Sequence, residues 1–157
     1  MQNKLPINIV RWAIAIPAGL AAWFGANYSI GVAFGFLHGF DAVEEFWDSS
    51  DMNGMPYSGT YILLVTRIVA AAALVGMTVY LVPRYHKRVA ITMASIVSVA
   101  AMGFLGYLLF QAGSADIKFE PEGWYRSILD MLSIIIGAIF GAWMAYENQR
   151  KRTRRSA

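Results

Sequence analysis

Residues 61–82 read YILLVTRIVAAAALVGMTVYLV, an apolar stretch that holds a single charged residue, Arg67. A helix of about 20 apolar residues crosses a hydrocarbon core of about 30 Å, because each residue adds about 1.5 Å. Three further stretches have this character, at about residues 7–36, 89–110 and 127–146. The sequence therefore predicts an all-α membrane protein, a four-transmembrane-helix bundle that forms one integral membrane domain over residues 1–157.

The composition excludes several functional classes. Only 15% of the residues are charged and 57% are hydrophobic, whereas a soluble domain has about 25% charged residues. The chain contains no cysteine, which excludes disulfides, zinc–thiolate sites and iron–sulfur clusters. We find no catalytic, cofactor or nucleotide-binding motif, and therefore expect a protein that is not an enzyme and that carries no cofactor.

The charged residues outside the apolar stretches are sorted by sign. Ten basic residues lie near the N-terminus, between the second and third stretches, and in the tail 147–157, together with one acidic residue, Glu147. The other two connections hold eight acidic residues against two basic ones, Lys118 and Arg126. Because Lys and Arg are retained in the cytoplasm during insertion, we predict that both termini are cytoplasmic. For a small chain without another targeting signal, we expect a bacterial inner membrane.

Two ionisable residues lie well inside apolar stretches, Arg67 in the second and Asp130 in the fourth. An isolated charge at this depth is costly. Each lies six residues after an aromatic residue, Tyr61 and Trp124, and both helices would run in the same direction, so we predict an intramembrane ion pair. The pair has two possible roles, a structural link or a substrate or proton site. In a third interpretation the residues do not meet and Arg67 extends toward the headgroups.

Small residues recur at helical spacing in the first and fourth stretches. Such rows allow close contact between transmembrane helices. The sequence leaves open whether the contact lies within one chain or between copies. For Asn27, in the middle of the first stretch, we expect an interhelical hydrogen bond. The rows consist of Ala15, Gly19, Ala22, Ala26, Ser29 and Ala33 in the first stretch, and of Ser133, Gly137, Gly141 and Ala145 in the fourth.

The first helix is expected to continue outside the membrane as far as Asp48. On this extension, His38, Asp41 and Glu45 fall on one face, and such ligands suit a divalent cation. We favour a solvated polar face and predict no metal site. The second histidine, His86, would lie on the other side of the membrane, so the two histidines cannot hold one haem.

Three functions are compatible with these features. The first is an accessory or interaction subunit of a membrane complex, with a membrane-protein partner or a second copy. The second is a small transporter or channel component, which would need a polar cavity that reaches Arg67 and Asp130. The third is a membrane enzyme acting on lipid or prenyl substrates. We favour the first, since the sequence lacks the internal repeat of many transporters. The basic tail should contact anionic lipid; it lacks interleaved aromatic residues, so we expect no nucleic-acid binding.

Overall fold

The computed structural model describes residues 5–39, 57–83, 85–114 and 121–155. These residues form four helices and no strand: α1 (Leu5–His38), α3 (Tyr57–Leu81), α4 (His86–Ser114) and α5 (Pro121–Arg155). Each helix contains a segment that is long and apolar enough to cross a membrane, at Asn8–Leu37, Tyr61–Leu81, His86–Phe110 and Ser127–Asn148. For the described residues, the predicted all-helical class with four helices long and apolar enough to span a membrane is confirmed.

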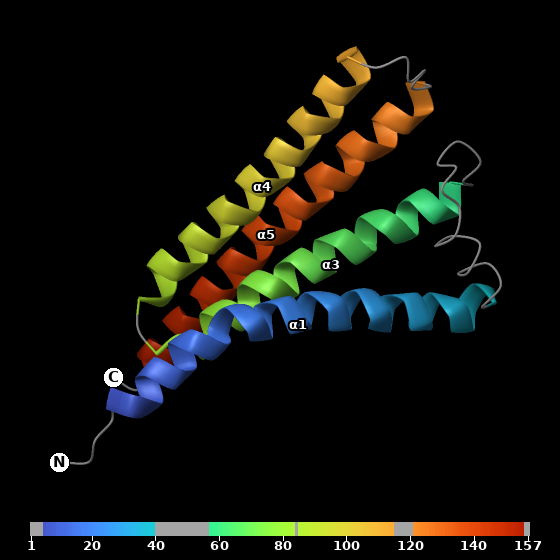
Figure 1. Cartoon of the computed structure of the whole chain (residues 1–157). Helices are drawn as coiled ribbons and strands as arrows, with labels where there is room; N and C mark the ends of the chain where they lie inside the picture. The colour runs from blue at the N-terminus through green and yellow to red at the C-terminus, as the bar shows by residue number, and fades with distance from the viewer. Residues whose placement is uncertain (1–4, 40–56, 84, 115–120, 156–157) are drawn as a thin grey trace.

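The helices pack in the order α1, α3, α5, α4. The helix α3 contacts α1 on one side and α5 on the other, α5 also contacts α4, and α3 makes a smaller contact with α4. The helix α1 begins and α5 ends at the same end of the molecule, and α1 and α3 diverge from α4 and α5 toward the opposite end (Figure 1). We call these the termini end and the loop end, the latter being where α1 ends and α3 begins.

The first helix bends and then ends at a glycine. Pro17 lies inside α1 and lacks the N–H that would bond to the preceding turn, which is a common cause of bending; Figure 1 shows the bend in the N-terminal half of α1. At the other end, Gly39 adopts a φ of 91° and its N–H donates to the carbonyl oxygen of Gly35 at 2.9 Å. This is the hydrogen bond of a left-handed helix cap.

The helix α1 therefore ends at His38, because a left-handed residue turns the chain out of the helix at Gly39. The remainder of the expected helical extension, with Asp41, Glu45 and Asp48, lies outside the described residues.

The core surrounds α3, which has the most buried of the four membrane-spanning segments. The segments of α1 and α4 are the least buried, so most of their apolar side chains would face lipid or another protein. The largest fully buried side chains are valines of α3 and of the turn after it, namely Val75, Val79 and Val82. Small and β-branched residues thus allow the neighbouring helices to approach α3 closely.

Side chains of two other helices bond to the last turn of α3. The final carbonyl groups of a helix have no partner within it. Arg11 of α1 donates from Nε to the carbonyl oxygen of Leu81 at 3.1 Å, and Nδ1 of His86, the first residue of α4, lies 3.0 Å from the carbonyl oxygen of Val79. A carbonyl oxygen only accepts, so His86 donates from Nδ1. The starts of α1 and α4 are therefore fixed to the end of α3.

Candidate functional site

Two glycines of α5 bring its backbone against that of α3. Gly137 lies against the backbone of Ile68, and a Cβ atom on Gly141 would be 2.7 Å from the carbonyl oxygen of Ala72. Neither position has room for a side chain without a shift of the backbone. Three members of the predicted row in the fourth stretch, Ser133 among them, are buried here. This row packs within one chain and is not a contact between copies.

The structure brings Arg67 and Asp130 together between α3 and α5. Arg67 donates from Nε to Oδ1 of Asp130 at 2.9 Å, and the two side chains are 26% and 18% exposed. The interpretation in which Arg67 only extends toward the headgroups does not describe this geometry. The two charges are opposite and in direct contact, so each satisfies the other inside an apolar segment.

The two residues do not face each other at one level of the helix pair. Ile68, the neighbour of Arg67, contacts Gly137, whereas Asp130 precedes Gly137 by about two helical turns. The side chain of Arg67 must therefore extend toward the loop end to reach the carboxylate. The equal spacing of Arg67 from Tyr61 and of Asp130 from Trp124 suggested that the two residues lie at the same depth. The contact of Gly137 with Ile68 instead places Asp130 closer to the loop end than Arg67.

The other polar side chains within the described spans bond mainly to their own helix. Thr66, Thr78 and Ser133 each donate to the carbonyl oxygen four residues earlier, at 2.7, 2.8 and 2.6 Å respectively. Asn27 donates from Nδ2 to the carbonyl oxygen of Trp23 at 2.9 Å, and its buried Oδ1 has no partner. Among the described residues, Asn27 therefore bonds to its own helix and not, as expected, to another helix; a carbonyl oxygen one turn earlier offers a local acceptor.

The small residues of α1 divide between two faces. Ala15 and Gly19 are buried, and Gly19 lies against the side chain of Thr78 and the backbone of Leu74 on α3. Ser29 and Ala33, which belong to the same predicted row, are exposed. They continue a second row with four-residue spacing, which we call the α1 ridge: Ala21, Gly25, Ser29 and Ala33, all exposed.

The α1 ridge was not recognised in the sequence, although its regular spacing is a signal that points to it. At Gly25 an added Cβ atom would meet no other atom within 4 Å. The backbone of α1 is therefore open to close approach from outside the chain at this position.

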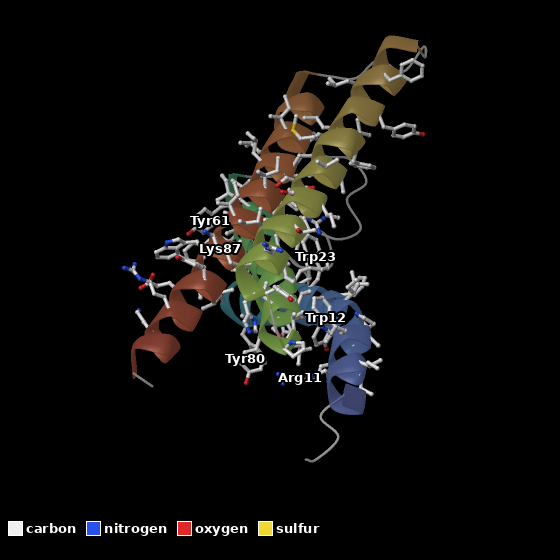
Figure 2. All side chains as sticks on the ribbon, turned by 90° about the vertical axis from the view of Figure 1, so that its left-hand side faces the viewer. Arg11, Trp12, Trp23, Tyr61, Tyr80 and Lys87 are labelled. Carbon is white, nitrogen blue, oxygen red and sulfur yellow. The ribbon has the colours of Figure 1, made fainter. Side chains whose placement is uncertain are left out.

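A cavity of about 830 Å³ lies between α3 and α5, on the termini side of the ion pair. It extends from Ile68 and Phe140 to Tyr80 and Lys151, and neither Arg67 nor Asp130 lines it. Most of its lining is apolar, with Asn148 and Lys151 at one end. We call it the α3–α5 cavity. Figure 2, in which the termini end faces the viewer, shows Tyr80 at this end together with Arg11 and Lys87.

The candidate cation ligands are not brought together in the part of the chain that the structure describes. His38 is the last residue of α1, and Asp41 and Glu45 lie in the undescribed residues 40–56. Residues 5–39, 57–83, 85–114 and 121–155 contain no group of three or more histidines and carboxylates that could hold a metal ion. His86 is half-buried and directed at the end of α3.

Comparison of the chain with protein-family models, with curated proteins and with solved structures gave no match.

Proposed function

We propose that this chain is a non-enzymatic accessory or interaction subunit of a membrane complex, and that a transmembrane helix of its partner packs on the α1 ridge. The observation that carries the proposal is the exposed row of small residues at Ala21, Gly25, Ser29 and Ala33. Between membrane helices, small residues at this spacing allow two backbones to approach closely and gain van der Waals contacts.

The position of α1 in the fold supports this role. Among the described residues, α1 packs on α3 and makes no comparable contact with α4 or α5. The contact with α3 uses the face of Ala15 and Gly19, and the open ridge lies on a different face. A partner helix can therefore bind without displacing any helix of this chain.

The Arg67–Asp130 pair is proposed as a structural link between α3 and α5. Its charges are matched and hydrogen-bonded, so neither group is left free to load a substrate. A transporter or channel component, the alternative, would need a polar path to the pair. The α3–α5 cavity is mainly apolar and is lined by other residues, which favours the interaction subunit.

We place the protein in a bacterial inner membrane with the termini end in the cytoplasm. The charge pattern supports this orientation, because basic residues mark the cytoplasmic ends of membrane helices. In the described part of the chain, the basic residues at this end include Arg11, Lys87, Arg88, Arg150 and Lys151.

The test is co-purification from native membranes with Gly25→Leu, which fills the open position on the ridge. The control is Gly103→Leu on α4, an exposed glycine whose added Cβ would also meet no atom within 4 Å. We expect a partner at fixed stoichiometry with the wild-type chain and with Gly103→Leu, and a loss of about tenfold or more with Gly25→Leu, since one bulky side chain prevents backbone contact.

Two results would contradict the proposal. One is a wild-type chain that leaves native membranes as a monomer with nothing bound. The other is a partner retained equally by both leucine variants. A second copy is distinguished from a different protein by Gly25→Cys, the sole cysteine in an otherwise cysteine-free chain, because only a homo-oligomer through this ridge forms a disulfide-linked dimer at that position.

A further inference from the structure

We infer that the α3–α5 cavity is a binding site for one anionic phospholipid. One acyl chain lies along the cavity between α3 and α5, and the headgroup lies at the termini end beside Asn148 and Lys151. The inference concerns a different surface from the α1 ridge and does not rest on the proposed function. It is carried by the shape of the cavity and by the separation of apolar and polar groups along it.

The cavity is elongated along the helices. On α3 it extends from Ile68 to Tyr80, a distance of about 18 Å along a helix. The lining residues Ile68, Ala72, Gly76 and Tyr80 recur every four residues, so the cavity follows the axis of α3. This elongated shape suits a flexible chain of methylene groups.

The lining suits an acyl chain. Small residues form part of it, and an added Cβ atom at Gly76 would meet no atom within 4 Å. Met77 of α3 and Met144 of α5 also line the cavity and are partly exposed. Methionine side chains are flexible and polarisable, so they adapt to an irregular or mobile apolar ligand.

Polar groups occur at one end only. Asn148 is the last residue of the apolar segment of α5, and Lys151 lies about one turn beyond it. The amide of Asn148 and the ammonium of Lys151 are hydrogen-bond donors, and no acidic residue is among the described residues that line the cavity. This arrangement complements a ligand with an apolar chain and a negatively charged phosphate at one end.

The test uses the full-length protein reconstituted in phosphatidylcholine bilayers. The probe is phosphatidylglycerol that carries a photoreactive diazirine in one acyl chain. After irradiation, the labelled residues are mapped by peptide mass spectrometry. We expect labelling to concentrate on residues 68–80 of α3 and 140–151 of α5, and a matched phosphatidylcholine probe to label these segments less.

Two variants separate the chain site from the headgroup site. Gly76→Leu should abolish the concentrated labelling by both probes, whereas Gly103→Leu on α4 should leave it unchanged. Lys151→Gln should reduce the preference for phosphatidylglycerol about fivefold, the effect of one basic residue near an anionic surface. Arg150→Gln removes a neighbouring charge that does not line the cavity and should change the preference much less.

Three results would overturn the inference. The first is labelling spread evenly over the outward faces of the four helices. The second is unchanged labelling in Gly76→Leu when its thermal unfolding matches that of Gly103→Leu. The third is an efficient disulfide-linked dimer through Gly76→Cys in the bilayer, which would show that a second copy covers the cavity. A Lys151→Gln variant with the wild-type lipid preference would overturn the headgroup assignment.

Discussion

Gly137 of α5 lies directly against the backbone of Ile68 on α3, with no space between them for a side chain. Gly141 repeats this contact one turn later, against the backbone of Ala72. Because lipid tails are as apolar as leucine side chains, helices in a membrane associate mainly through close packing and interhelical hydrogen bonds. The two glycines therefore set the distance between α3 and α5, and with it the position from which Arg67 reaches Asp130.

We expect Gly137→Ala to lower the free energy of unfolding by about 1–3 kcal/mol, the usual cost of overpacking a well-filled contact. The added methyl group would meet backbone atoms of Ile68, which cannot move as a flexible side chain can. The measurement is equilibrium unfolding of the purified protein in mixed detergent micelles. Gly103→Ala, at an open position on α4, is the control and should cost nothing. Equal stability of the two alanine variants would contradict the packing described for α3 and α5.

Removing one member of the ion pair should cost more than removing both. Arg67→Leu leaves the carboxylate of Asp130 without its partner, and breaking a buried pair in this way costs about 3–5 kcal/mol. The double variant Arg67→Leu with Asp130→Leu removes both charges and should unfold within about 1 kcal/mol of the wild type, because apolar replacements of buried pairs are often neutral. The same unfolding measurement gives the coupling energy from a double-mutant cycle.

Two results together would contradict a structural role for the pair. The double-leucine variant would be as stable as the wild type, and it would have lost an ion or substrate flux that the wild type shows in sealed liposomes. The pair would then serve transport. A double variant destabilised by the sum of the two single variants, Arg67→Leu and Asp130→Leu, would show instead that the two side chains do not interact.

The four membrane-spanning helices could be predicted from the sequence because length and apolarity alone define them. The stretch expected at 61–82 is observed at Tyr61–Leu81, and that expected at 127–146 is observed at Ser127–Asn148. The pairing of α3 with α5 follows from Arg67 and Asp130, since a charged residue inside an apolar segment needs a partner. Both features can be predicted because each depends on one large energetic cost: exposing polar groups to lipid, or leaving a charge unpaired inside an apolar segment.

The details of packing could not be predicted, because several faces of the same helix carry similar residues. The row that contains Ala15 and Gly19 and the α1 ridge that contains Gly25 are both rows of small residues, and only the arrangement of helices decides which one meets α3. Asn27 was expected to bond to another helix but bonds to the carbonyl of Trp23. A local acceptor is available in every helix, whereas an interhelical one depends on a register that the sequence does not specify.

The charge pattern makes a prediction about the two sides of the membrane that can be tested with single cysteines. Ser114 is the last residue of α4 at the loop end, and Ala157 is the last residue of the chain. In intact bacterial cells, a maleimide that does not cross the inner membrane should label Ser114→Cys at once and Ala157→Cys only after the membrane is permeabilised. The wild-type chain, which contains no cysteine, gives the background. The expected result follows from retention of the basic residues in the cytoplasm, and the reverse labelling pattern would show that the acidic connections lie inside.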